Sequence, residues 1–134
     1  MKRKSVAAHE HASGLTAREV AALRARLEQE IEGLRPRLAK HLDEATTDSS
    51  LTLADEMDQA SRHTEQAYLL RLADKERKLV TELEHALTKF AKGTYGVCEG
   101  TGEPIGLRRL EARPWARHSI QFKEQLERER GRAS

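Results

Sequence analysis

The sequence lacks the cysteine pairs that form disulfides or bind structural zinc, and it lacks a long apolar segment. Its 134 residues include one cysteine, Cys98, which excludes an internal disulfide and cannot by itself supply a four-thiolate zinc site. No apolar run approaches the roughly 18 residues of a membrane span. The basic start MKRK has no apolar stretch behind it. We therefore expect a soluble, cytoplasmic chain without a membrane partner.

Large apolar residues and an excess of one charge are also scarce. The apolar fraction is 37%, below the roughly 45–50% usual for globular chains, so a thick core is not expected. Lys and Arg number 24 against 22 Asp and Glu, which does not mark a nucleic-acid binder. Residues 107–134, however, hold eight Lys or Arg and four Glu. This region is either a solvated helix or a face for a phosphate or an acidic protein.

Glycine and aromatic residues gather late in the chain. Five of the eight glycines lie in residues 93–106, and four of the five aromatics lie in or beside that stretch. The composition predicts a small compact non-helical region there, which we call the knob. It belongs to a C-terminal globular region, the head, at residues 93–134. Residues 1–14 are polar and aperiodic, and we expect a flexible tail.

Two long helices should precede the knob. Thr16 and Glu19 fit a capping box at a helix start, and apolar residues then recur every three or four positions to Leu42. Pro36 predicts a kink. The polar residues 45–51 favour a turn, and a second helix should run from about Asp58 to Lys92 with Glu76 interrupting its apolar seam. The prediction is a mainly α fold, with an antiparallel coiled-coil hairpin at 15–92 and a last helix at about 116–129.

The hairpin tip, at about 43–60, is acidic. Residues 43–58 hold six carboxylates and no Lys or Arg. One interpretation is structural, because Asp55 can cap the second helix and Asp58 favours its positive end. The other is that the stalk carries these carboxylates to metal or basic groups inside a partner.

The knob has the outline of a zinc finger without its ligands. Cys98 and Thr101 stand where a first Cys-x-x-Cys would be, and Ser119 and Phe122 where the second would be. A bound zinc is therefore not expected. Cys98 is either a small buried side chain or a redox-sensing thiol. No arrangement of residues indicates an enzyme.

The segment YGVCEGTGEPIGLRRLEARPWA, residues 95–116, resembles the C-terminal finger of the DksA/TraR family of bacterial RNA polymerase regulators. Asp55-Glu-Met-Asp58-Gln-Ala60 also fits the D-x-x-D-x-A tip motif known in that family. The resemblance covers about residues 17–125. It implies a coiled coil, a finger head and a C-terminal helix, in a protein whose stalk enters the polymerase secondary channel and alters initiation-complex lifetime during the stringent response.

The same resemblance implies residue roles. Asp55, Asp58 and Ala60 would be the tip effectors, and Arg71 would contact polymerase. A guanosine tetraphosphate site is implied at four positions: Lys75, Leu79, Arg113 and Lys123. Glu82 stands where the family has a lysine and should repel a polyphosphate. Three of the four zinc cysteines are replaced, as in zinc-independent members.

Three hypotheses follow for function. The favoured one is a zinc-independent, monomeric regulator that binds RNA polymerase and contacts no specific DNA sequence. The second is a transcript-cleavage factor, which also inserts an acidic coiled coil into that channel. The third is a coiled-coil interaction protein that no longer binds polymerase. Without metal, the head should be held by its apolar residues, and we expect Trp115 to be buried among them.

Overall fold

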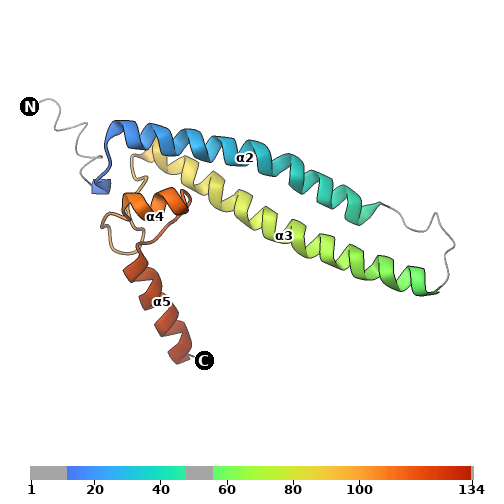
Figure 1. The fold of residues 1–134 in the computed structure, drawn as a ribbon. Helices are drawn as coiled ribbons and strands as arrows, with labels where there is room; N and C mark the ends of the chain where they lie inside the picture. The colour runs from blue at the N-terminus through green and yellow to red at the C-terminus, as the bar shows by residue number, and fades with distance from the viewer. Residues whose placement is uncertain (1–11, 48–55, 134) are drawn as a thin grey trace, which may run out of the picture. The chain divides into compact units, whose positions relative to one another are not determined.

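Helices make up most of the chain, and the computed structural model describes residues 12–47 and 56–133. The helices are α2 (Ala17–Thr46), α3 (Glu56–Lys92), α4 (Leu107–Ala112) and α5 (Ile120–Ala133) (Figure 1). Over the described ranges there is no strand, only one isolated bridge between Val97 and Pro104. The mainly α prediction is confirmed.

The start of α2 has the predicted capping box. The Thr16 backbone N–H donates to the Glu19 carboxylate at 2.9 Å, and the Glu19 N–H donates to the Thr16 hydroxyl at 3.1 Å. These bonds satisfy amides that have no partner inside the helix. The helix continues through Pro36 to Thr46, two residues into the predicted turn. The second helix begins two residues before the predicted Asp58.

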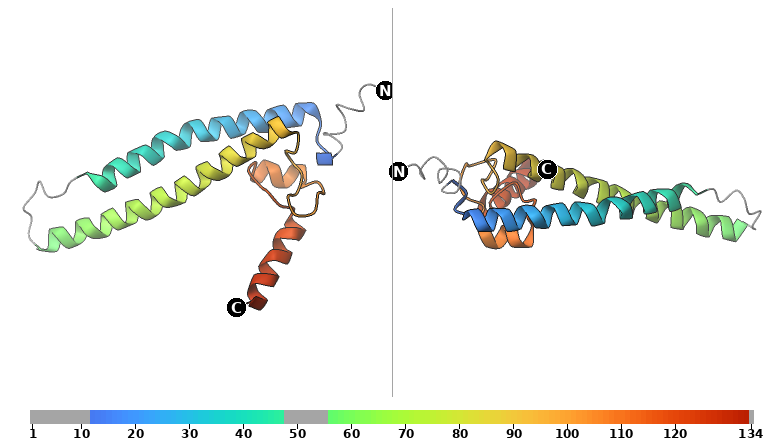
Figure 2. Two further views of the ribbon diagram at one scale, coloured as in Figure 1. Left: turned by 180° about the vertical axis from the view of Figure 1, so that it is seen from behind. Right: turned by 90° about the horizontal axis from the view of Figure 1, so that it is seen from above.

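The chain divides into two compact units, each containing part of α2 and part of α3. The finger unit comprises Met1–Gln29 and Glu82–Ser134, and the hairpin unit comprises Glu30–Thr81. Within each unit the two helix segments lie antiparallel and side by side in every view (Figure 2). The expected division at residues 14 and 92 stays a prediction.

The hairpin unit has a thin core with one charged member. Ile31 and Leu34 of α2 are buried, as are Ala73 and Val80 of α3. Glu76 is also buried, and its carboxylate lies 2.7 Å from Nδ1 of His41. Glu76 interrupts the apolar seam, as expected, and its carboxylate has a partner across the helix pair, which the sequence pattern did not predict.

The finger unit is centred on α4, which sequence reasoning missed. Leu110 of α4 is fully buried, and Leu27, Leu83 and Tyr95 are buried in the same unit. Trp115 is only half-buried, which corrects the expectation that it belongs to the core.

The N-terminal residues also reach this core. Residues 1–11 of the expected tail lie outside the described ranges, whereas Ser13 and Leu15 are buried. Gly96 has φ +84°, and a Cβ there would lie 3.0 Å from both. The close approach therefore requires glycine.

The last helix begins later than predicted, at Ile120 and not at about 116. Pro114 is buried and forms a turn with Trp115, and residues 116–119 are not helical. The Phe122 N–H donates to the Ser119 hydroxyl at 3.3 Å, so Ser119 caps the helix.

No helix in the described ranges has both the length and the apolar character needed to cross a bilayer.

Candidate functional site

The acidic tip is the first candidate. Asp55 lies outside the described residues. Asp58 is the third residue of α3, and its side chain lies outside the described ones. Ala60 is exposed on α3, and Asp43 and Glu44 are exposed near the end of α2. The effector role of Asp55, Asp58 and Ala60 stays a prediction.

Two exposed cations on α3 form the second candidate. Arg71 and Lys75 are exposed one turn apart in the hairpin unit, and Leu79, one turn further, is half-buried. Among the described residues neither cation has an ion pair, whereas the neighbouring Lys78 pairs with Asp74 at 3.1 Å. Arg71 and Lys75 can therefore pair with a partner's acidic groups without breaking an internal contact.

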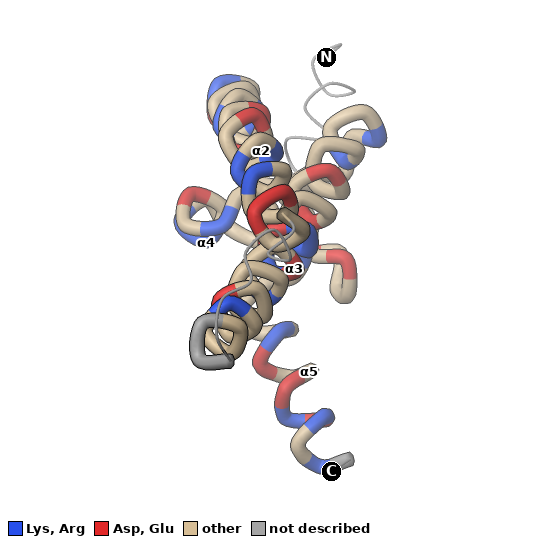
Figure 3. Tube along the Cα trace, turned by 90° about the vertical axis from the view of Figure 1, so that its right-hand side faces the viewer, with Lys and Arg blue, Asp and Glu red and all other residues tan. Residues whose placement is uncertain are grey.

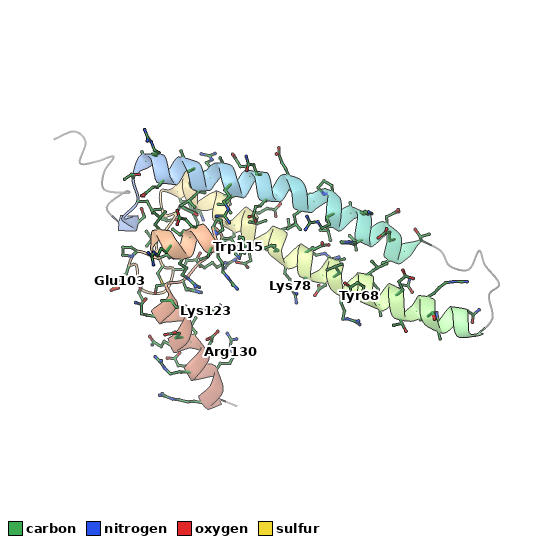
Figure 4. The ribbon with its side chains drawn as sticks, in the orientation of Figure 1. Tyr68, Lys78, Glu103, Trp115, Lys123 and Arg130 are labelled. Atoms are coloured by element: carbon green, nitrogen blue, oxygen red, sulfur yellow. The ribbon has the colours of Figure 1, made fainter. Side chains whose placement is uncertain are left out.

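The third candidate is a basic cavity of about 370 Å³ in the finger unit. Trp115 and His118 form part of its wall. Five cations and two carboxylates also line it: Arg109, Arg113, Arg117, Lys123, Arg130, Glu82 and Glu127. Figure 4 shows Trp115, Lys123 and Arg130 on this part of the molecule. Figure 3 shows that α5 itself carries both charges in alternation. The excess of positive charge suits an anion.

The structure brings together two of the four residues predicted to bind guanosine tetraphosphate. Arg113 and Lys123 both line the basic cavity, whereas Lys75 and Leu79 belong to the hairpin unit.

Glu82 behaves differently from what its charge alone suggests. The Arg117 guanidinium donates two hydrogen bonds to its carboxylate, at 2.8 and 3.3 Å. Arg117 therefore balances the charge that was expected to repel a polyphosphate. Arg117 was missed because 35 residues separate it from Glu82, and no local spacing joins them.

The four degenerate finger positions do not form a metal site. Thr101 is exposed, the Ser119 hydroxyl caps α5, and the Phe122 ring packs so closely on Gly100 that a Cβ there would lie 2.2 Å from it. Across the described part of the chain, no three His, Cys, Asp or Glu side chains are grouped to hold a metal. This donor set does not fit the four ligands of structural zinc.

Cys98 is buried at the start of the turn that residues 99–101 form. Burial raises the pKa of its thiol. Hydrogen bonds from the Thr101 hydroxyl and from backbone groups of Ser119, Thr101 and Gly100 outweigh that effect and lower the pKa to about 7. The thiol is therefore acidic but shielded, which fits the interpretation of Cys98 as a small buried side chain.

Comparison with family models gives two matches. Residues 19–90 match "DnaK suppressor protein DksA, N-terminal domain", and residues 93–120 match "Prokaryotic dksA/traR C4-type zinc finger". The first match alone covers more than half of the chain.

Relatives and one solved structure agree with these matches. An RNA polymerase-binding transcription factor DksA of Caulobacter vibrioides is 51% identical over 75 residues, which is 56% of this chain and 53% of that protein. The Escherichia coli K12 protein of the same name is 38% identical over 89 residues, covering 64% and 59%. The matches thus span little more than half of these relatives. The structure of transcription factor DksA2 from Pseudomonas aeruginosa has a TM-score of 0.74 and 36% identity, covering 85% of this chain and 87% of that one.

Proposed function

The chain belongs to the DksA/TraR family, and from this membership we propose that it regulates transcription by binding RNA polymerase. The observation that carries the proposal is the paired match of the helix pair and the finger, at residues 19–90 and 93–120. Relatives named as RNA polymerase-binding transcription factors support the choice of partner. We propose a regulator with no reaction of its own.

The proposed mechanism assigns separate tasks to the tip and to α3. The helix hairpin enters the polymerase secondary channel, where Asp55, Asp58 and Ala60 change the lifetime of the initiation complex. Arg71 contacts the rim of the channel. The exposure of Arg71, and its lack of an ion pair within the described ranges, support this role.

Guanosine tetraphosphate is the proposed small-molecule effector. Arg113 and Lys123, which line the basic cavity, would contact its phosphates. A role for Lys75 and Leu79, which belong to the hairpin unit, stays a prediction from the family resemblance. The pairing of Glu82 with Arg117 supports this proposal, since a neutralised carboxylate repels a phosphate less than a free one.

An in vitro assay tests the proposal in two steps. We expect the purified chain to bind core RNA polymerase in competition with a labelled secondary-channel factor. It should also shorten open-complex lifetime at a ribosomal RNA promoter, more strongly with guanosine tetraphosphate. Failure to bind core polymerase would instead favour a coiled-coil interaction protein.

The cleavage-factor alternative has its own readout. A transcript-cleavage factor added to a backtracked elongation complex shortens the RNA from its 3′ end. We expect no shortening here, and its appearance would replace the proposed role in initiation. The finger match at residues 93–120 favours the regulator over the cleavage factor.

A further inference from the structure

The finger segment, residues 93–120, needs some cross-link to α3, because its four ligand positions do not form a metal site. Eight of its backbone hydrogen bonds at turns, loops and helix ends lie within the segment, including Cys98 N–H to Glu103 O at 2.8 Å and Ile105 N–H to Gly96 O at 2.9 Å. Such bonds shape the turns. Two further backbone bonds reach α3 where the segment leaves the helix, from Gly93 N–H to Phe90 O at 3.2 Å and from Thr94 N–H to Lys89 O at 2.9 Å. Neither kind of bond explains what holds the later turns against the helix.

One carboxylate in the segment contacts three basic side chains. Glu99 Oε2 lies 2.5 Å from Nε2 of His85 and 3.2 Å from Nζ of Lys89. His85 and Lys89 are one turn apart near the end of α3, so both face the same carboxylate. Glu99 Oε1 lies 3.9 Å from the Arg117 guanidinium. Glu99 therefore contacts both α3 and Arg117, which lies near the end of the finger segment.

Arg117 extends this contact back to the helix. The Glu99 N–H donates to the Arg117 carbonyl at 2.9 Å, which joins the backbone at residue 99 to the backbone at residue 117. The Arg117 guanidinium also binds Glu82, one turn before His85 on α3. The side chains of Glu99 and Arg117 thus both tie the segment to α3, beyond the point where Tyr95 stacks on Phe90 at 4.0 Å between ring centroids.

Glu99 is itself exposed, with a side chain 32% exposed, but its partner Lys89 is buried, and this distinguishes the contact from an ordinary surface ion pair. The Lys89 side chain is 6% exposed, and its ammonium group has one further partner, the Val97 carbonyl at 3.5 Å. A buried ammonium group is costly unless it is paired. Burial raises the pKa of Glu99, but the hydrogen bonds and charges of His85 and Lys89 outweigh this and lower it. The carboxylate is thus charged and bound.

We propose that Glu99, held by His85, Lys89 and Arg117, fixes the finger segment to α3 and provides the cross-link that a metal provides in a C4-type finger. Phe122 adds an apolar contact where its ring covers Gly100. This inference concerns the fold of the finger and does not depend on polymerase binding.

The buried Cys98 thiol, next to Glu99, reports on the cross-link directly. We expect Glu99→Gln to raise the rate at which Ellman's reagent modifies Cys98 by about tenfold, since local opening becomes easier when a buried charge loses its partner. Glu103→Gln is the matched control, because Glu103 is exposed and its carboxylate has no ion pair among the described residues. Far-UV circular dichroism of each variant shows whether the helices persist.

Salt and a second substitution separate this proposal from other causes. In 1 M NaCl the modification rate should rise more in the parent than in Glu99→Gln. Lys89→Met combined with Glu99→Gln should expose Cys98 less than the sum of the two single changes predicts, because the unpaired ammonium is gone. If the effects of Lys89→Met and Glu99→Gln on the modification rate simply add, the proposal is overturned. This comparison remains decisive even if Glu99→Gln by itself unfolds the finger segment. Equal rates in Glu99→Gln and Glu103→Gln would also overturn it.

A metal test completes the experiment. The parent should keep its slow modification rate in excess chelator and show no change with added zinc. Tightly held zinc at one per chain, together with rapid modification after chelation, would show that a metal is the cross-link.

Discussion

At the scale of single residues, the Tyr95 hydroxyl stands out because it is buried and donates to the Pro114 carbonyl at 2.8 Å. Burial raises the pKa of Tyr95 far above its ordinary value. A raised pKa in the folded state means that the contribution to stability is complete below about pH 10 and is lost as pH rises further, because only the unfolded chain ionises readily.

Tyr95→Phe should therefore have two effects. At pH 7 it should cost about 1 kcal/mol through the lost hydrogen bond. Between pH 9 and 11 its stability should fall less steeply than that of the parent. Urea unfolding across this range measures both, with Tyr68→Phe as the control, since Tyr68 is 56% exposed. Parallel pH profiles for parent and Tyr95→Phe would contradict the prediction.

Asp58→Asn tests the tip. Asp58 lies in the first turn of α3, where losing its charge should cost about 0.3–1 kcal/mol of helix stability. We expect polymerase binding to persist while the effect on open-complex lifetime falls. Competition binding and lifetime are measured on the same variant, with Asp74→Asn as a control further along α3. A lifetime effect like that of the parent would refute the tip mechanism.

At the scale of elements, the helix pair of the hairpin unit depends on the contact between His41 and Glu76. Glu76→Leu alone should destabilise the chain by about 1–3 kcal/mol, because it leaves His41 half-buried without its partner. The double change His41→Leu with Glu76→Leu should recover most of this loss, since apolar residues often replace a buried pair without cost. Urea unfolding of the four proteins in this cycle measures the coupling. Strictly additive effects would show that the pair contributes nothing.

The short helix α4 should matter more than its length suggests. Leu110 is fully buried, so Leu110→Ala should cost about 2.7–5 kcal/mol. Trp115→Ala should cost less, about 1–2 kcal/mol, because its ring is half-buried beside the basic cavity. Thermal unfolding ranks the two, and a larger loss for Trp115→Ala would place the tryptophan in the core after all.

At the scale of the whole molecule, stability should not depend on metal or on thiol chemistry. Excess chelator should leave the thermal midpoint unchanged, and Cys98→Ser should leave both folding and transcriptional activity nearly intact. Differential scanning calorimetry and open-complex lifetime measure these. Loss of activity with peroxide in the parent, but not in Cys98→Ser, would instead identify Cys98 as a redox sensor.

The sequence alone determined the features that depend on local pattern. The start of α2 follows from Thr16 and Glu19, because a capping box is made by residues three apart. The mainly α fold follows from apolar residues repeating at helical spacing, and the family follows from the 95–116 motif together with the acidic tip. The missing metal ligands were also readable from their positions.

Only the tertiary structure decided which distant polar side chains meet. His41 and Glu76 are 35 residues apart, as are Glu82 and Arg117, and no local spacing predicts either pair. The sequence therefore predicted Glu76 as an interruption of the apolar seam and Glu82 as a source of repulsion, without predicting that His41 and Arg117 are their partners. Likewise, residue type predicted a buried Trp115, whereas the structure leaves it half-buried and buries Leu110 of α4 fully. Burial and pairing depend on what the folded chain brings within a few ångströms, which sequence separation does not reveal.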